Sequence, residues 1–139
     1  LNINAKNITI SNLTKEGLVV AGDISLLTRA LENLLINAIK FSPENTQIHI
    51  CSERIQQELV ITVEDEGPGI PEHDLAYILN AFYRADNSRN RSTGGFGLGL
   101  AIAEKIIRQH KGRLSLKNRA SGGLQAIVVI PLSERRNER

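Results

Sequence analysis

Two asparagines and a lysine lie on one side of the first long helix that the sequence predicts. Asn33, Asn37 and Lys40 recur at helical spacing, and at about 100° per residue they fall within about 60° of one another. A neutral amide oxygen can coordinate a hard cation such as Mg²⁺, and a lysine beside it can contact phosphate. The pattern therefore predicts a magnesium and phosphate site, although it also fits an ordinary polar helix face.

An acid continues the hydrophobic face of a predicted strand. Leu59, Ile61 and Val63 alternate within residues 58–65, and Asp65 has the same phase. That phase points Asp65 into the core, where an unpaired carboxylate costs upwards of ~1–3 kcal/mol and needs a donor such as a ligand amine or ordered water. The alternative is that the strand stops early and leaves Asp65 in a hydrated turn.

Glycines follow the acid and open a second long helix. Gly67 and Gly69 flank Pro68, where they allow a tight turn or a close approach of the backbone to a flat ligand. The run GGFGLG at 94–99 leads into a predicted helix, whose free N–H groups favour phosphate. Because the run follows no predicted strand and lacks the GK[ST] ending, it is neither a dinucleotide fingerprint nor a P-loop.

Two amphipathic helices must position these groups. The first follows an N-cap at Asp23 and ends at Ser42-Pro43, and the second runs from near Gly97 to Gly112, with a short helix near 72–79 between them. The apolar stripes of the long helices are formed by Ile24, Leu27, Leu31, Leu34, Leu35 and Ala38, and by Leu98, Ile102, Ile106, Ile107 and His110.

Short strands complete the pattern. They are expected at 6–11, 18–20, 46–54, 58–65, 113–119 and 124–131. Residues 84–97 carry almost nothing apolar and are expected to form a loop. Strands mixed with helices, with hairpins at the end of the chain, favour an α+β fold: a two-layer sandwich with helices on one face of the sheet.

Composition limits the class of protein. With 139 residues, 41% hydrophobic and 23% charged, the chain is expected to fold as one domain rather than as a disordered, collagenous or coiled-coil chain. The single cysteine, Cys51, cannot form an internal disulfide and fits a reducing compartment. No apolar run reaches the ~18 residues of a membrane helix. Because the chain neither begins with Met nor shows a signal peptide, we expect it to be part of a longer protein.

Taken together and in this order, the motifs strongly resemble the catalytic ATP-binding domain of sensor histidine kinases, in the GHKL superfamily. The segments that carry the resemblance are ENLLINAIKFSP at 32–43 for the N box, DEGPGIP at 65–71 for the first glycine box, AFYRADNSR at 81–89 for the F box and GGFGLGLAI at 94–102 for the second glycine box. The resemblance implies a mixed, mostly antiparallel sheet of about five strands covered on one face by about three helices. It implies one catalytic domain over residues 1–132, followed by a solvated tail at 133–139.

The resemblance also implies a Mg-ATP site. Asn37 would coordinate Mg²⁺ with the assistance of Asn33, and Lys40 would contact phosphate; these three are the expected catalytic residues. Asp65 would accept a hydrogen bond from the exocyclic amine of adenine, directly and through water. Further nucleotide contacts are implied for Phe41, Gly67, Gly69 and Ile70 around adenine, Phe82, Arg84 and Arg89 on a lid, and Gly95, Gly97, Leu98, Gly99 and Leu100 at its hinge and beside the phosphates.

The implied activity is that of an ATP-dependent protein-histidine kinase. The γ-phosphate would pass to a histidine on a dimerisation hairpin absent from this chain, because His49, His73 and His110 lack the sequence context of a phosphoacceptor. The other implied partner is a response regulator of a two-component system. The isolated domain is expected to be monomeric and cytoplasmic, with the parent an inner-membrane sensor that meets the membrane only through its other segments.

Two other functions are considered. A GHKL clamp that hydrolyses ATP would carry a water-activating glutamate at the position of Asn33, whereas Glu32 lies one step away, rotated by ~100° around the helix. A nucleic-acid module could use the basic stretch 105–119, but that stretch has no interleaved aromatic residues. No nucleic-acid partner is therefore expected, and hydrolysis is expected to be slow.

Overall fold

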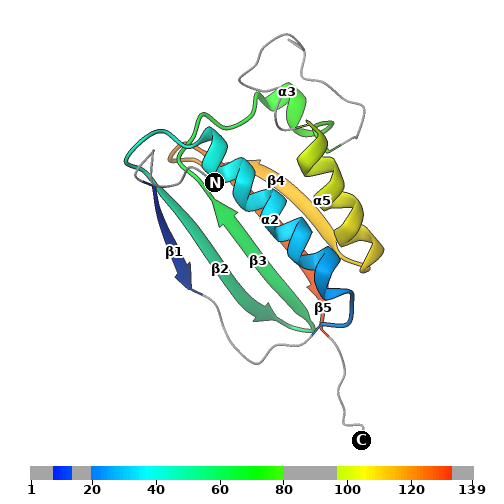
Figure 1. Cartoon of the computed structure of the whole chain (residues 1–139). Coiled ribbons are helices and arrows are strands. Elements are labelled where there is room, and N and C mark those ends of the chain that lie inside the picture. Colours follow the sequence, from blue (N-terminus) through cyan, green and yellow to red (C-terminus); the bar gives the residue numbers. More distant parts are fainter. Residues whose placement is uncertain (1–7, 14–19, 80–96, 133–139) are drawn as a thin grey trace, which may run out of the picture.

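A five-stranded mixed sheet forms one layer of the molecule. The computed structural model describes residues 8–13, 20–79 and 97–132. The strands are β1 (Thr9–Leu13), β2 (Gln47–Ile55), β3 (Glu58–Glu64), β4 (Arg113–Asn118) and β5 (Leu124–Pro131). Their order across the sheet is β1-β2-β3-β5-β4 (Figure 1). Only β1 pairs in parallel, with β2, and the other three pairings are antiparallel.

The register of the strands gathers apolar side chains on one face. Val63 of β3 pairs with Ile50 of β2 and with Ala126 of β5, so the three side chains point to the same side. On the opposite face, Thr62 pairs with Cys51. The thiol of Cys51 is free and half-buried.

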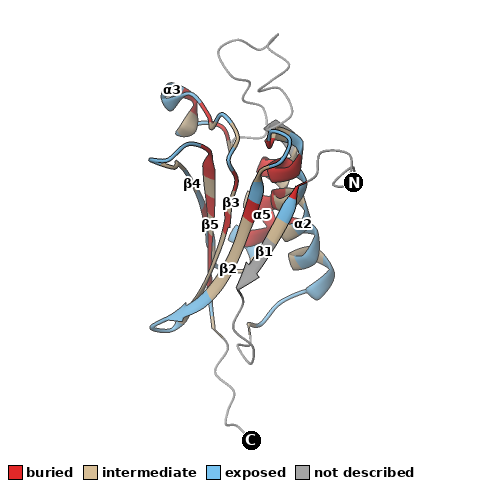
Figure 2. Ribbon diagram, turned by 90° about the vertical axis from the view of Figure 1, so that its left-hand side faces the viewer, coloured by how far each residue is buried: buried red, intermediate tan, exposed pale blue. Residues whose placement is uncertain are grey.

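Helices α2 (Ile24–Phe41) and α5 (Gly97–Gln109) cover the apolar face, while the short α3 (Glu72–Leu75) lies beyond one end of the sheet (Figures 1 and 2). The two long helices pack against each other, running in opposite directions. Ala30 of α2 and Ala103 of α5 are both fully buried. Among the described residues, no helix has both the length and the apolar character needed to cross a bilayer.

The core between the layers is aliphatic. Its largest fully buried apolar side chains are Ile48, Ile78, Leu100, Ile107 and Val128. Each contributes about 1.5–3 kcal/mol when it is withdrawn from water. The predicted two-layer α+β sandwich is confirmed, with the sheet, the helical layer and the aliphatic core in their expected places.

Local signals set the ends of α2. The side chain of Asp23 accepts a hydrogen bond from the backbone N–H of Leu26, as expected for its N-cap position. At the other end the Ser42 hydroxyl donates to the carbonyl of Ala38 at 2.6 Å, and Pro43 follows. Ile24 departs from the predicted apolar stripe, since it is 80% exposed. It is the first residue of the helix and has no preceding turn to hold it against the sheet.

The ends of β2, β3 and β4 lie within one residue of the sequence predictions, and three other elements differ more. The first strand covers Thr9–Leu13 rather than 6–11. The short helix ends at Leu75 and continues as turns. The strand expected at 18–20 falls largely outside the described residues, and Val20 is not in a strand. The lid loop expected at 84–97 also falls almost entirely outside the described residues.

His110 joins the two long helices where α2 begins and α5 ends. Its Nε2 accepts a hydrogen bond from the backbone N–H of Asp23 at 3.0 Å, so the ring proton is on Nδ1 and is donated to the carbonyl of Ile106 at 2.8 Å. A side-chain carbon at Gly22 would overlap the His110 ring. Two hydrogen bonds therefore hold the imidazole, and the missing side chain at Gly22 leaves the space that the ring occupies.

We expect Gly22→Ala to lower the free energy of unfolding by about 1–3 kcal/mol, because it displaces the His110 ring from both bonds. Urea unfolding measures the change. Ser25→Ala, an exposed site in the first turn of α2, is the control and should stay within about 0.5 kcal/mol. In a His110→Ala background the Gly22→Ala change should cost much less; an equal cost in both backgrounds would contradict the proposed contact.

Candidate functional site

A buried carboxylate marks the end of β3. Asp65 is 5% exposed, as its strand phase predicts and contrary to the hydrated-turn alternative. Its Oδ1 accepts hydrogen bonds from the backbone N–H groups of Gly67 at 2.8 Å and Leu124 at 3.1 Å. No described residue donates to Oδ2. One oxygen thus accepts two protein hydrogen bonds, and the other accepts none from a described residue.

Burial raises the pKa of the Asp65 carboxyl above its ordinary value of 3.8. Desolvation is the largest cause; the Gly67 and Leu124 hydrogen bonds and the Arg119 charge oppose it. The guanidinium of Arg119 donates to the Asp65 backbone carbonyl at 2.6 Å, which holds this charge beside the carboxylate. The surroundings therefore, on balance, disfavour the ionised acid, and a ligand donor at Oδ2 would stabilise the ionised form.

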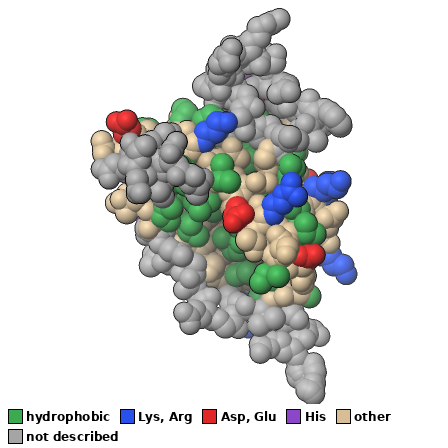
Figure 3. Space-filling model, viewed as in Figure 1, with side chains coloured by type: hydrophobic (Ala, Val, Ile, Leu, Met, Phe, Trp, Pro, Cys, Tyr) green, Lys and Arg blue, Asp and Glu red, His purple; other side chains and the backbone are tan. Residues whose placement is uncertain are grey.

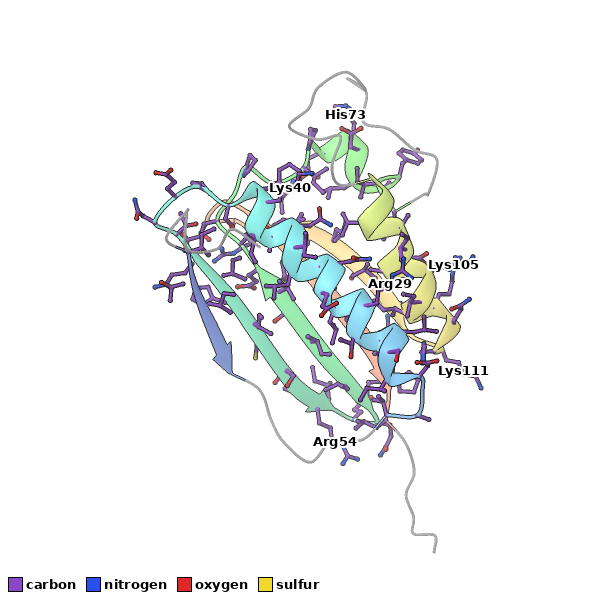
Figure 4. All side chains as sticks on the ribbon, viewed as in Figure 1. Arg29, Lys40, Arg54, His73, Lys105 and Lys111 are labelled. Atoms are coloured by element: carbon purple, nitrogen blue, oxygen red, sulfur yellow. The ribbon has the colours of Figure 1, made fainter. Side chains whose placement is uncertain are left out.

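The 65–70 loop packs against the end of α2. A side-chain carbon added at Gly67 would lie 2.5 Å from the Phe41 carbonyl oxygen, so only glycine permits this approach. Lys40 lies beside the same helix end, with its Nζ 5.6 Å from the centre of the Phe41 ring. Figure 4 shows Lys40 at the end of the molecule where α3 lies, away from Arg54 and Lys111. The loop after Asp65 therefore meets the backbone at the end of α2, the helix turn that carries the lysine and the aromatic ring.

The asparagines of α2 face the first turn of α5. Asn33 Nδ2 donates to the carbonyl of Gly99 at 3.3 Å, and Asn37 Nδ2 donates to the carbonyl of Asn33 at 3.2 Å. Asn37 is 8% exposed, and no described residue donates to its side-chain oxygen. A side-chain carbon at Gly99 would lie 3.4 Å from Asn37 Nδ2. An amide oxygen is thus left for a cation beside a helix start, where backbone N–H groups lack intrahelical partners.

The structure brings most of the described predicted residues into one continuous surface. It runs from Gly99 through the two asparagines to Phe41 and on to Asp65. Leu100 is 1% exposed in the core, so only its backbone could face a ligand. Phe82, Arg84, Arg89 and Gly95 lie outside the described residues; Gly97 and Leu98 begin α5, and the side chain of Leu98 is also outside them.

Sequence reasoning missed a second group of residues, in the turn that joins β4 to β5. We call residues 118–124 the β4–β5 corner. This corner contacts the 65–70 loop. Asn118 bonds to the backbone of Ile70, Arg119 bonds to the carbonyl of Asp65, and Gly123 at φ +103° lies so close to that carbonyl that a side-chain carbon would overlap it. Gly122-Gly123 was the only signal, and it indicated a turn rather than a contact.

Acidic groups near the site provide no metal cluster. Among residues 8–13, 20–79 and 97–132, no three His, Cys, Asp or Glu side chains could together hold a metal ion. Glu32 lines an apolar hollow between α2 and the sheet, together with Leu31 and Val63. Its side chain therefore leaves the helix on a different side from the Asn33 contact with Gly99. A cation here would depend on amide oxygens and on the phosphates of a ligand.

The basic stretch at 105–119 does not form one surface. Lys105 and Arg108 are exposed on α5, whereas Arg113 and Lys117 alternate with core residues of β4 and point away from the helices. Arg113 is paired with Glu58 at 3.4 Å. In Figure 3, basic and acidic side chains are interspersed over the helical face. The described charges therefore do not resemble the continuous basic patch of a nucleic-acid-binding surface.

Comparison with known proteins identifies the family. Residues 22–134 match the family described as histidine kinase-, DNA gyrase B-, and HSP90-like ATPase. The chain is 40% identical over 114 residues to the sensor histidine kinase CpxA of Escherichia coli, covering 82% of this chain and 24% of that protein. It is 35% identical over 131 residues to the sensor histidine kinase WalK of Bacillus subtilis, covering 93% of this chain and 21% of that protein. The chain thus spans about a quarter or less of these relatives.

A solved structure supports the same assignment. The catalytic domain of histidine kinase ThkA, in a nucleotide-free form, superposes with a TM-score of 0.80 at 35% identity, covering 94% of this chain and 84% of that chain. Both long helices and strands β2 to β5 fall within residues 22–134, and β1 precedes them. The chain therefore belongs to the histidine kinase-, DNA gyrase B- and HSP90-like ATPases and is an ATP-binding domain of the sensor histidine kinase type.

Proposed function

We propose that this domain binds Mg-ATP and donates the γ-phosphate to a histidine on a dimerisation and phosphoacceptor hairpin outside this chain. The observation that carries the proposal is the buried Asp65 carboxylate, which keeps one oxygen without a described protein donor beside a glycine-lined loop. A purine amine is a donor of the right kind for that oxygen. Contacts continue from this loop to the end of α2, and from Asn33 and Asn37 to Gly99 at the start of α5, where the phosphates are proposed to bind.

On the base side, Asp65 accepts the exocyclic amine of adenine, directly and through water. Gly67, Gly69 and Ile70 shape the pocket, and Phe41 packs beside the base. A carboxylate at this point favours adenine, because a carbonyl oxygen in place of the amine would face the negative charge with no proton between them.

On the phosphate side, the Asn37 side-chain oxygen is the proposed Mg²⁺ ligand, with Asn33 assisting and Lys40 on phosphate. When bound, Mg²⁺ supplies charge neutralisation to the phosphates, which is the main requirement of phosphoryl transfer. Backbone N–H groups at Gly97, Leu98, Gly99 and Leu100 are proposed phosphate donors. The roles of Phe82, Arg84, Arg89 and Gly95 as lid contacts remain part of the proposal.

The identity of Asn33, one helical turn before Asn37, favours phosphate transfer to histidine over a clamp that hydrolyses ATP. Asn33 bonds to Gly99 and cannot act as a base toward water, and Glu32 lines a hollow elsewhere on α2. We further propose that residues 1–132 make up the functional domain, that its partners are the parent's own hairpin and a response regulator, and that the isolated domain is a monomer. The parent is proposed to be an inner-membrane sensor with this domain in the cytoplasm.

Asp65→Asn should weaken ATP binding by about 10–100-fold, because a hydrogen bond to a charged acceptor is lost and an amide N–H₂ faces the adenine amine. Isothermal titration of the wild type and the variant with Mg-ATP measures the change. Glu66→Gln, at the exposed neighbouring position, is the matched control and should bind like the wild type. Equal ATP affinities for Asp65→Asn and wild type would contradict the proposal that Asp65 binds the adenine amine.

Asn37→Ala should abolish most of the dependence of ATP affinity on Mg²⁺, since it deletes the free amide oxygen. The measurement compares titrations in magnesium and in EDTA. Glu32→Gln, one residue before Asn33 on the same helix, should keep both the Mg²⁺ dependence and the slow hydrolysis of the wild type. A magnesium effect that survives in Asn37→Ala would refute the ligand assignment, and loss of hydrolysis in Glu32→Gln would favour the hydrolytic clamp.

Because the pKa of Asp65 is raised, the free energy of unfolding of the nucleotide-free protein should depend on pH. Between the ordinary value of 3.8 and the higher folded value, the folded protein binds the proton more tightly than the unfolded chain, so stability falls as pH rises. The stability of Asp65→Asn minus that of wild type should therefore increase from about pH 4 to about pH 7 in urea unfolding.

The exposed Glu44→Gln is the control for this pH series and should show a smaller change over the same range. A difference between Asp65→Asn and wild type that shrinks as pH rises would have the wrong sign for a buried acid.

A further inference from the structure

Asn118, the last residue of β4, forms two hydrogen bonds with the backbone of the 65–70 loop. Asn118 Oδ1 accepts a hydrogen bond from the Ile70 N–H at 2.9 Å, and its Nδ2 donates to the Ile70 carbonyl at 2.7 Å. The same Nδ2 donates to Glu72 Oε2 at 3.0 Å. One side-chain amide therefore satisfies both backbone groups of a residue far away in the sequence.

The loop passes closely over this amide. Gly69 has φ +77°, in the left-handed region, and a side-chain carbon there would lie 2.5 Å from Asn118 Oδ1. Glycine is required for both reasons. The Ile70 side chain is buried, so the clasped backbone is also anchored in the core.

The other end of the loop is held by the same β4–β5 corner. Asp65 N–H donates to the Leu124 carbonyl at 3.0 Å, and the guanidinium of Arg119 donates to the Asp65 carbonyl. The corner thus fixes the loop at Asp65 and at Ile70, and Asn118 alone among the corner's side chains bonds to the backbone at the Ile70 end.

We propose that Asn118 is a positioning residue for recognition of the adenine base. The inference rests on the proposed function, because it assigns the 65–70 loop to the base. Without the amide, the N–H and carbonyl of Ile70 lose their partners and the loop shifts away from the geometry that Asp65 and Gly67 share. The phosphate side is held separately, by the Asn33 bond to Gly99 of α5 and the Asn37 bond to the Asn33 carbonyl within α2, so it keeps its geometry.

The test separates the base from the phosphates. Wild type and Asn118→Ala are titrated with Mg-ATP and with magnesium and inorganic tripolyphosphate, which has no base. We expect ATP affinity to fall about tenfold in Asn118→Ala and tripolyphosphate affinity to stay within about twofold. Lys117→Ala, an exposed neighbour on β4, is the matched control and should bind both ligands like the wild type.

A milder variant covers the case in which Asn118→Ala does not fold. Asn118→Ser leaves a hydroxyl that an ordered water can bridge to Ile70, and it should show the same split with an ATP loss of about threefold or more. Circular dichroism at the titration temperature establishes that each variant is folded.

Three outcomes overturn the inference. Unchanged ATP affinity in folded variants shows that the Asn118 bonds to Ile70 do not affect binding of the base. In that case ATP binding by the wild type still supports the proposed function. Equal losses for ATP and tripolyphosphate show a general structural role. Failure of the wild type itself to bind ATP removes the proposed function, and the positioning role with it.

Discussion

The structure is organised around a carboxylate that has to be buried and still remain usable. Asp65 is withdrawn from water at the end of β3, and desolvation raises its pKa. Two backbone N–H groups and the nearby guanidinium of Arg119 offset part of this cost, and all three donors leave Oδ2 untouched. A second protein donor on Oδ2 would stabilise the fold and fill the position proposed for the ligand. The domain thus gives up stability at the point where binding is proposed to occur.

The antiparallel helical layer brings the remaining groups to the same end of the sheet. Because α2 and α5 run in opposite directions, the last turns of α2 lie beside the first turns of α5. That places amide side chains, a lysine and a helix N-terminus together. The imidazole of His110 fastens the far end of the pair. These bonds limit the movement of α2 along α5, and this supports the Asn33 contact with Gly99 at the other end of the helix pair.

Backbone contacts, more than side-chain chemistry, join the separate motifs into one surface. Gly67 touches the Phe41 carbonyl, Gly123 touches the Asp65 carbonyl, and Gly99 lies against Asn37. At Gly67 and Gly123 the glycine lets one segment approach another more closely than a side chain would permit, whereas a side-chain carbon at Gly99 would lie at ordinary contact distance from Asn37. Gly67, in the first of the glycine motifs, therefore acts here as a packing position at which the loop after β3 meets the end of α2.

Periodicity was enough to predict the long helices, most strands and the inward direction of Asp65, and residue type was enough to predict the N-cap at Asp23. These features are local, because the phase of a strand or helix decides which face a side chain takes. The partners of those side chains were decided only by the tertiary structure. Asn118 and Arg119 bond to backbone groups 48 and 54 residues away. A backbone N–H or carbonyl is the same at every residue, so such a contact leaves no pattern of residue types to read and appears only when the strands are laid side by side.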